Sequence, residues 1–318
     1  MKKALVIDLG GTKVRVSLVD VNGKVYSKPH LKQKVMRAGN KQLTEQIFSM
    51  IDSLFKEFNV SKKDIIGIGV GSAGIIDRKN LTINDAPNLL DISRTITFPR
   101  ELKKKAGLPV YLINDTSAGA LGSYYFGYGK NKRYKVVVYL TLSTGTNIGV
   151  VIGGKVFNGA KGMSPELGHI RIEKNGKRCN DGALGHLEPY ISGSGIEGTA
   201  KAIFRKSISG RQIFDLAWDG NQKARAILDD SADYLAAAFG IVISLFSPDL
   251  IEIGGGLIKN RDLLVTPAIK RLSDPKKYIN YTLIKPQFHP LIKITKLGDD
   301  IVTKGAGVFV FNKGKLLF

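Results

Sequence analysis

The stretch "IDLGGTK", residues 7–13, joins an apolar run to a glycine turn, and the sequence after the turn decides the fold. Val14, Val16 and Leu18 alternate with polar residues, and "VNGK" follows at residues 21–24. This alternation predicts a second strand that ends in a hairpin turn. A Rossmann loop needs a helix after its glycines, and a Walker A loop needs Ser or Thr after its lysine. Both of these nucleotide-binding loops are therefore disfavoured.

The residues of this turn nevertheless suit a phosphate group. Glycine lets backbone amides approach phosphate oxygens, and the turn also offers a hydroxyl and an ammonium group. A carboxylate beside polyphosphate is favourable where Mg²⁺ lies between them, so Asp8 is a candidate partner of that ion. The alternative is an ordinary hairpin turn. The candidate phosphate-binding residues are Asp8, Gly10, Gly11, Thr12 and Lys13.

The same design occurs a second time, at residues 135–156, where strands flank "LSTGTNIG" at 142–149. A transferable phosphate needs contacts from both sides, so Thr144, Gly145 and Thr146 join the candidates for binding ATP. Two such units suggest two similar domains. Helices are predicted at residues 42–58, 99–106, 116–126, 233–246 and 263–272, and further strands at 65–70, 109–115 and 249–256.

The composition narrows the class of protein. A chain of 318 residues exceeds the usual size of a single core, which favours two domains. The longest apolar run, residues 236–246, is about half a membrane span. Cys179 is the only cysteine, so an intrachain disulfide is impossible. We expect a cytoplasmic protein that does not bind membranes.

The net charge of +21 would suit a nucleic-acid-binding protein, but the excess of lysine and arginine is spread along the chain. Short clusters such as residues 103–105 are typical of solvated helix faces. We therefore expect no nucleic-acid partner, and the charge would instead attract anionic small molecules such as ATP.

Further short motifs follow in a specific order: "APNL" at 86–89, "IND" at 113–115, "ELGH" at 166–169, "GHLE" at 185–188, "IGGG" at 253–256 and "LGDD" at 297–300. With "DLGGTK" and "STGTNIG", they make nearly the whole chain resemble the ROK family of sugar kinases and sugar-responsive repressors. The resemblance implies a two-domain α/β fold of the actin and hexokinase type, with ATP and a sugar bound in a cleft between the domains. It also implies transfer of phosphate from ATP to a hexose hydroxyl with Mg²⁺ as cofactor.

The resemblance further implies a smaller domain of residues 1–114 plus 299–318, a larger domain of residues 115–298, and a homodimer or homotetramer. In the larger domain, an apolar helix around residues 233–246 or its neighbours would form the dimer contact.

Asp115 of "IND" matches the family's catalytic base, although an aspartate before a helix is also a common N-cap. The residues that match family sugar contacts are Gly74, Asn88, Asn114, Asp115, Glu166, His169 and Glu188. Amides and carboxylates suit a polyhydroxy ligand because they exchange hydrogen bonds with hydroxyl groups. Gly254, Gly255 and Gly256 would let an adenine or a ribose lie against backbone, but a helix-capping turn explains them equally well.

The largest departure from the family lies at "CNDGALGHLE", residues 179–188, where family members often place three cysteines that bind structural zinc with a histidine. The matching residues here are His169, Cys179, Asp181 and His186. This set keeps the spacing of the family's zinc ligands, but it offers one thiolate where the family has three. We expect a loop without tightly bound zinc, with a zinc site as the alternative.

Three functions compete on this sequence. A sugar kinase acting on glucose or a close hexose is favoured, and an N-acetylglucosamine or N-acetylmannosamine kinase would share the same frame. A sugar-sensing repressor is the second function. Repressors of this type carry a helix-turn-helix segment before the glycine turn, and with seven residues before Asp8 we expect none here. An actin-like ATPase is the third, and it would not need Glu166, His169 and Glu188.

Overall fold

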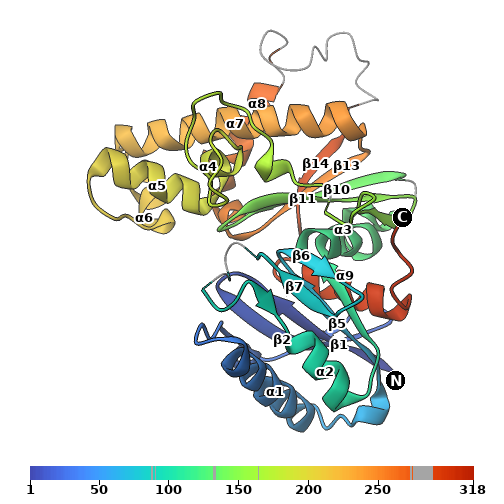
Figure 1. The fold of residues 1–318 in the computed structure, drawn as a ribbon. Helices are drawn as coiled ribbons and strands as arrows, with labels where there is room; N and C mark the ends of the chain where they lie inside the picture. Colours follow the sequence, from blue (N-terminus) through green and yellow to red (C-terminus); the bar gives the residue numbers. More distant parts are fainter. Residues whose placement is uncertain (87–88, 90, 132–133, 164, 273, 275–288) are drawn as a thin grey trace. The chain divides into compact units, whose positions relative to one another are not determined.

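The computed structural model describes residues 1–86, 89, 91–131, 134–163, 165–272, 274 and 289–318. Figure 1 shows the ribbon with its element labels. The strands are β1 Lys3–Leu9, β2 Lys13–Asp20, β3 Val25–Tyr26, β4 Lys32–Lys34, β5 Ile65–Ser72, β6 Ile75–Asp77, β7 Thr82–Asn84, β8 Thr95–Ile96, β9 Val110–Asn114, β10 Val136–Leu142, β11 Thr146–Ile152, β12 Lys155–Phe157, β13 Leu250–Gly254 and β14 Leu291–Ile294. The α-helices are α1 Asn40–Glu57, α2 Phe98–Ala106, α3 Asp115–Phe126, α4 Glu188–Ile191, α5 Gly193–Phe204, α6 Gly210–Trp218, α7 Gln222–Phe246, α8 Val265–Leu272 and α9 Asp300–Phe311. The 3₁₀ helices include η2 Lys62–Asp64, η5 Leu167–His169 and η6 Gly256–Leu263.

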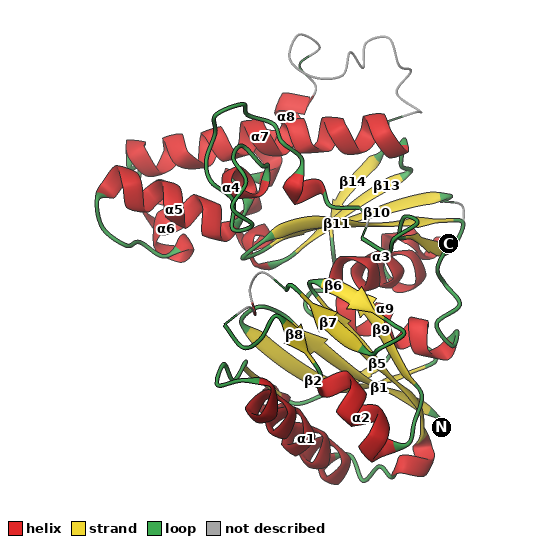
Figure 2. Ribbon diagram, viewed as in Figure 1, coloured by secondary structure: helices red, strands yellow, loops and turns green. Residues whose placement is uncertain are grey.

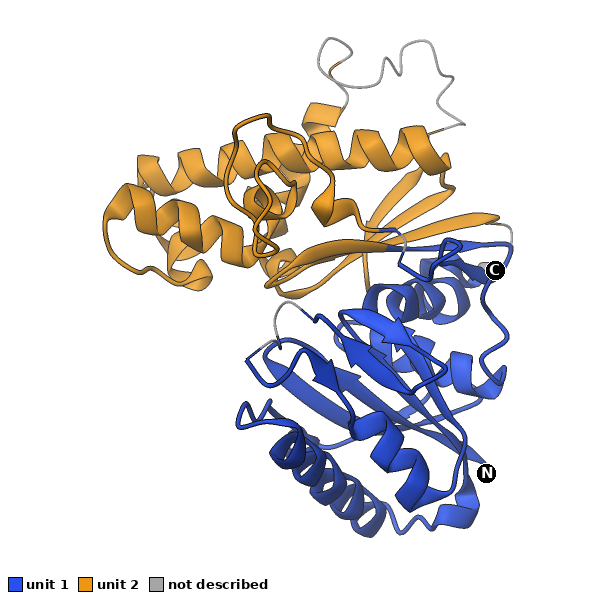
Figure 3. Cartoon of the chain, in the orientation of Figure 1, with its two compact units in different colours: residues 1–133, 149–165, 296–318 blue, residues 134–148, 166–295 orange. Residues whose placement is uncertain are grey.

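The chain forms two compact units, coloured separately in Figure 3. Unit 1 comprises residues 1–133, 149–165 and 296–318, and unit 2 comprises residues 134–148 and 166–295. These bounds differ from the domain bounds expected from the sequence, mainly because α3 falls in unit 1. The division into residues 1–114 plus 299–318 and residues 115–298 stays a prediction.

The sheet of unit 1 has the strand order β3-β2-β1-β5-β9, with β4 paired to β2. The second strand predicted after the glycine turn is confirmed as β2, which runs antiparallel to β1, and the hairpin turn predicted at residues 21–24 joins β2 to β3. Strands β1, β5 and β9 run parallel. Figure 2 shows α1 and α2 against this sheet. Apolar side chains of α1, including Leu43, Ile47 and Leu54, share one buried core with Ile68 and Val70 of β5.

The glycines of β5 face α9 rather than this core, since successive strand residues point to opposite faces of a sheet. A Cβ atom at Gly69 would lie 2.9 Å from Val310 and 3.0 Å from the backbone oxygen of Ala306. Because glycine has no side chain, the backbone of α9 can lie directly on the strand.

Helices α3 and α9 also pack through glycine. A Cβ atom at Gly305 would lie 1.7 Å from the backbone oxygen of Ala118, and one at Gly122 would lie 2.1 Å from that of Ile301. Both distances are far shorter than any real carbon contact, so each helix needs its glycine here. This close packing explains why α3 belongs to unit 1.

Unit 2 is built around the parallel strands β10, β13 and β14. The whole sheet has the order β12-β11-β10-β13-β14, and β11 runs from unit 2 into unit 1, where it pairs with β12. The strand, turn and strand predicted at residues 135–156 are confirmed as β10 and β11, with β12 following. Helix α7 begins at Gln222, eleven residues before the predicted start at residue 233.

Among the residues that the structure describes, no helix combines the length and the apolar character needed to cross a membrane.

Candidate functional site

Two predicted carboxylates of unit 1, Asp8 and Asp115, lie at the same edge of the parallel part of the sheet. In the ladder of β1, β5 and β9, Leu9 lies opposite Ser72, and Ser72 lies opposite Asn114. Asp8 therefore precedes the last residue of β1, and Asp115 directly follows the last residue of β9. Both acids stand at the carboxyl edge of the sheet, which is where open α/β sheets bind their ligands.

Asp8 lies in a group of charged side chains. Burial raises its pKa from the ordinary 3.8 to about 7, and Asp115 adds to the rise, while Arg15 and Lys32 oppose it. Arg15 is the cross-strand partner of Asp8 and donates to Asp300 at 2.7 Å. A cation close to Asp8 would remove the repulsion between these carboxylates, and carboxylate oxygens are donors that Mg²⁺ prefers. Asp8 and its surroundings therefore fit a magnesium ion.

The structure separates the two roles that the sequence left open for Asp115. The N-cap of α3 is Asn114, whose side-chain oxygen accepts hydrogen bonds from the backbone nitrogens of Thr116 and Ser117. Asp115 accepts from the Thr116 nitrogen at 2.8 Å, which orients its carboxyl group. Burial raises the pKa of Asp115, although the hydrogen bonds from backbone nitrogens lower it. A carboxyl group with a raised pKa at a sheet edge suits a proton acceptor.

The glycine turn after β1 is held by backbone hydrogen bonds. The nitrogen of Gly10 donates to the oxygen of Lys13 at 2.9 Å, and Arg37 donates to the oxygen of Gly11. The nitrogen of Val35 donates to the oxygen of Thr12 at 3.1 Å. The turn is thus fixed through its carbonyl groups.

Gly74 and Asn88 were predicted to lie near the sugar. Gly74 has a φ of 95°, and a Cβ atom there would lie 2.8 Å from the Cβ of Ala86. The turn between β5 and β6 alone therefore requires glycine at this position. Asn88 lies outside the described residues.

In the second turn, only part of the predicted ATP-binding set presents its side chain to solvent. Thr144 is exposed, whereas Thr146 is 3 % exposed and its nitrogen donates to Glu188 at 3.1 Å. The N-terminus of α5 covers the carbonyl groups of the turn: Gly193 donates to Ser143 at 2.7 Å and Ser194 donates to Thr144. Thr144 and Gly145 remain the residues of this turn best placed to meet a ligand.

The three glycines after β13 also differ from one another. A Cβ atom at Gly254 would lie 2.4 Å from the hydroxyl oxygen of Tyr139, and one at Gly255 would lie 2.3 Å from the backbone oxygen of Leu142. No described atom lies within 4 Å of a Cβ built at Gly256. Packing on β10 explains the first two glycines, and Gly256 is the one with open space beside it.

Three predicted sugar contacts of unit 2 lie around η5 and the start of α4. The amide nitrogen of Asn147 donates to Glu166 Oε2 at 2.6 Å, and His169 Nε2 lies 4.0 Å from the same oxygen. The other carboxylate, Glu188, accepts from the backbone of β11. Gly168 permits this arrangement because a Cβ atom there would lie 2.3 Å from the oxygen of Thr146.

The residues of the possible zinc site are brought together. One potential ligand atom from each of His169, Cys179, Asp181 and His186 lies within 4.8 Å of the others. Burial and the carboxyl groups of Glu188 and Asp181 raise the pKa of the Cys179 thiol to about 11, so without a cation the thiol stays protonated. Imidazole, thiolate and carboxylate are all zinc ligands. The donor set therefore fits zinc in kind and in number.

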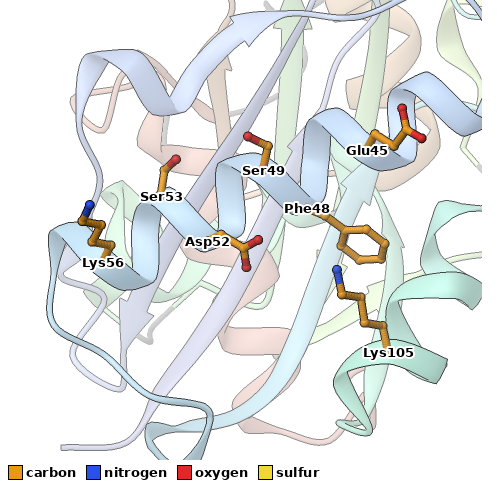
Figure 4. A pocket seen from close by; sticks show the side chains of 7 residues that line it. All are labelled: Glu45, Phe48, Ser49, Asp52, Ser53, Lys56 and Lys105. Carbon is orange, nitrogen blue, oxygen red and sulfur yellow. The ribbon is translucent and has the colours of Figure 1, made fainter.

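A hollow on the surface of unit 1 contains none of the predicted site residues (Figure 4). It lies along α1 and is lined by Glu45, Phe48, Ser49, Asp52, Ser53, Lys56 and Lys105. The ammonium group of Lys105 lies 4.3 Å from the centre of the Phe48 ring. This cation–π contact joins α2 to α1.

Sequence reasoning missed Arg15, Lys32, Asn147 and Asp299. Asp299 Oδ2 lies 2.5 Å from Lys32 Nζ, which brings the "LGDD" motif close to Asp8. Arg15 lies opposite Asp8 in the antiparallel pair of β1 and β2, and only the register of these strands reveals this. Asn147 stands inside a motif that was already recognised, but nothing in the sequence shows that it contacts Glu166.

Comparison with known proteins agrees with this picture. Residues 4–312 match the ROK family, and the chain belongs to that family. The glucokinase of Thermotoga maritima is 32 % identical over 287 residues, which cover 86 % of this chain and 87 % of the relative. A ROK family glucokinase from Streptomyces griseus, solved in complex with glucose and AMPPNP, superposes with a TM-score of 0.78 at 26 % identity, covering 98 % of this chain and 99 % of that one. The α/β fold of the actin and hexokinase type is thereby confirmed.

Relatives with another function also match. The xylose repressor of Caldicellulosiruptor bescii is 27 % identical over 321 residues, which cover 96 % of this chain and 77 % of the repressor. Family membership alone therefore leaves two functions to weigh.

Proposed function

We propose that this chain is an ATP-dependent sugar kinase that transfers the γ-phosphate to the 6-hydroxyl of a hexose, with glucose or a close hexose favoured. The proposal rests on Asp115. A backbone nitrogen orients its carboxyl group, and burial raises the pKa of that group. The charge of Asp115 also acts on Asp8 and contributes to the raised pKa of Asp8. The similarity to a glucokinase over most of the chain supports it.

In the proposed reaction, Asp115 accepts the proton of the sugar hydroxyl as that oxygen attacks the γ-phosphorus. The new bond joins the sugar oxygen to phosphorus, and the bond to the β-phosphate oxygen breaks, which releases ADP. A base is most effective when its pKa lies near the working pH. The rise in the pKa of Asp115 acts in this direction.

The phosphates of ATP would be bound by the backbone amides of the two turns, with Thr12, Lys13 and Thr144 as side-chain partners. Asp8 would hold Mg²⁺, directly or through water, and the ion when bound neutralises part of the phosphate charge. Gly256 offers space for the nucleoside.

The sugar hydroxyls would be bound by Glu166, His169, Glu188 and Asn114. Asn147 would orient Glu166, since it holds one of the two carboxylate oxygens. The side-chain oxygen of Asn114 is engaged in capping α3, so we assign the sugar contact to its amide nitrogen. His169, Cys179, Asp181 and His186 would hold zinc, which when bound would fix the loop that carries His169.

A panel of hexoses and N-acetylhexosamines with ATP and Mg²⁺ tests the proposal directly. We expect ADP and a sugar 6-phosphate from glucose or a close hexose, and Asp115→Asn should lower kcat by about 100-fold or more with little change in ATP binding. Asp85→Asn is the matched control, because Asp85 is an exposed aspartate of the same unit. Turnover of Asp115→Asn within a few-fold of the parent would remove Asp115 from the role of base.

The repressor relatives support a second candidate, a sugar-sensing regulator. Such a protein would bind a sugar without consuming ATP. Sugar binding by calorimetry, with no ADP formed from any sugar of the panel, would favour it. An N-acetylhexosamine kinase is distinguished by the preferred sugar. The homodimer or homotetramer and the cytoplasmic location remain predictions, and light scattering tests the former.

A further inference from the structure

The dipeptide Asn-Gly occurs at residues 22–23, 158–159 and 175–176 of the chain. An asparagine in this dipeptide readily loses its side-chain amide, because glycine has no side chain to keep its backbone nitrogen away from the preceding Cγ atom. The reaction needs a glycine nitrogen that can lose its proton and move toward Cγ. The fold therefore decides which of the three pairs can react.

The first two pairs are protected by the native structure. The nitrogen of Gly23 donates to the oxygen of Asp20 at 3.0 Å, and a Cβ atom at Gly23 would lie 2.4 Å from the Phe126 ring. Attack by this nitrogen would break the hydrogen bond that closes the turn. In the second pair, Asn158 is 6 % exposed, so water and hydroxide have little access to its side chain.

The third pair has neither protection. Asn175 is exposed in a turn, and its side chain accepts or donates no hydrogen bond within the described part of the chain. Among the same residues, the nitrogen of Gly176 has no acceptor. The guanidinium group of Arg171 donates to the oxygen of Lys174, which puts a positive charge beside the pair. A nearby cation favours the deprotonated nitrogen and the negative oxygen that forms during the attack.

We propose that Asn175 is a modification site, where the side-chain amide is lost through a cyclic imide with Gly176, and that it reacts before the other two pairs. The deprotonated Gly176 nitrogen attacks Cγ of Asn175. A carbon–nitrogen bond forms, the bond from Cγ to Nδ2 breaks, and ammonia leaves with the proton. Water then adds to either carbonyl carbon of the imide and opens the ring. One product is aspartate, and in the other, isoaspartate, the backbone runs through Cγ.

The isoaspartate lengthens the backbone by one carbon where the fold leaves no room. A Cβ atom at Gly176 would lie 2.0 Å from the hydroxyl oxygen of Tyr190 and 3.0 Å from the Cα of Gly185. The next residue is held on both sides, since the nitrogen of Lys177 donates to the Tyr190 hydroxyl at 2.8 Å and its oxygen accepts from the Gly185 nitrogen at 2.9 Å. Formation of isoaspartate therefore disrupts these two hydrogen bonds.

Peptide mapping by mass spectrometry tests the site. The whole protein is incubated at mildly alkaline pH in water labelled with oxygen-18, which marks each asparagine that reacts. We expect Asn175 to react at least about tenfold faster than Asn22 and Asn158, because the protected pairs must first open locally. In urea the three rates should lie within about threefold of one another. No reaction at Asn175, equal rates in the folded protein, or the same preference in urea would overturn the proposal.

Hydrogen exchange tests the consequence for the loop. The isoaspartyl fraction of aged protein, separated by ion exchange, should exchange the amide hydrogens of Lys177 and Gly185 at least about tenfold faster than fresh protein. Asn175→Gln is the matched variant, because its side chain is one carbon longer and forms the ring far more slowly; after the same incubation it should keep both amides protected. Unchanged exchange in the isoaspartyl fraction would contradict the predicted disruption. These readouts use neither sugar nor ATP, so their outcome is independent of the proposed kinase function.

Discussion

Unit 1 and unit 2 position their reactive side chains in different ways. In unit 1, Asp8 and Asp115 stand at the ends of parallel strands, and the ladder of β1, β5 and β9 fixes their spacing. In unit 2, the potential metal ligands, among them His169 and His186, lie on η5 and the loop that follows it. Short backbone hydrogen bonds hold this loop in place. The position of the unit 1 carboxylates depends on the packing of the sheet with α9 and α3. The position of the unit 2 ligands depends on local turns.

The two sites are therefore sensitive to different structural changes. A change in the packing of α9 should disturb the carboxylates of unit 1 from a distance, because the helix lies directly on β5. The loop of unit 2 should be insensitive to such changes. Its own carboxylates are oriented one at a time, by Asn147 for Glu166 and by the Ala183 nitrogen for Asp181.

The largest effect is expected from Gly305→Ala, which would break the close contact of α9 with α3. The added carbon would lie 1.7 Å from the oxygen of Ala118, so the helices must separate, and we expect a loss of about 3 kcal/mol or more in unfolding free energy. Urea denaturation measures it. The control is Gly198→Ala in α5 of unit 2, where the new carbon meets no described atom within 4 Å and a gain of about 0.5 kcal/mol is expected. Equal effects of the two substitutions would contradict the comparison.

The second effect is a pH dependence that unit 1 should show through Asp8. Its pKa is raised from 3.8 to about 7, so the folded protein binds this proton more tightly than the unfolded chain. In metal-free protein, stability should therefore fall as the pH rises from about 4 to about 7 and then level off. With allowance for the partial exposure of Asp8, the contribution is roughly 2 kcal/mol.

Urea midpoints between pH 4 and pH 8 test this, with Asp8→Asn as the comparison. The variant should lose most of the decline because it has no proton to release. A decline of the same size in Asp8→Asn would show that another group causes it.

The third effect concerns the orientation of Glu166 in unit 2. Asn147→Ala removes the hydrogen bond to its Oε2 atom, and under the proposed function sugar affinity should fall about tenfold, or about 1.4 kcal/mol, while ATP affinity changes little. Calorimetry with each ligand distinguishes the two. Asn175→Ala, an exposed position of the same unit, is the control. A parental sugar affinity in Asn147→Ala would mean that Glu166 needs no such support.

The smallest effect is expected at Asn114, which caps α3 and is also a proposed sugar contact. Asn114→Ala removes the N-cap of α3 and should cost about 1 kcal/mol of stability, whereas Asn114→Ser should restore most of it because serine caps helices nearly as well. Thermal unfolding of the three proteins makes the measurement. If alanine and serine are equally destabilising, the cap is not what Asn114 contributes.

The sequence was sufficient for the features that depend on local patterns. The hairpin around the first glycine turn, the second strand–turn–strand and the placement of Asp115 after a strand all followed from apolar alternation and turn residues. The three-stranded sheet of β6, β7 and β8 had no prediction, because these strands have only two or three residues each. Helix α9 was missed because its apolar residues run nearly all round the helix, which gives no clear amphipathic period.

Interactions between distant segments could not be predicted. The contact of Lys32 with Asp299 joins positions far apart in the chain, and no pattern in either segment indicates the other. The N-cap of α3 was assigned as a possibility to Asp115, but the helix starts one residue earlier than the motif suggests, so Asn114 takes that role. The convergence of the zinc donors required the path of the loop, although their spacing had identified them.

The return of the chain to unit 1 at residue 296 has a consequence for synthesis on the ribosome. Helix α9, residues 300–311, covers the glycine face of β5 and packs along α3, so the core of unit 1 stays incomplete until this helix has emerged. The segments of unit 2, which end at residue 295, are all translated before it. Domains usually fold as units during translation, with the N-terminal one first. Here the unit that starts first is the one that must finish last, and a nascent chain stalled before residue 300 should expose the sheet surface of unit 1 to chaperones and proteases.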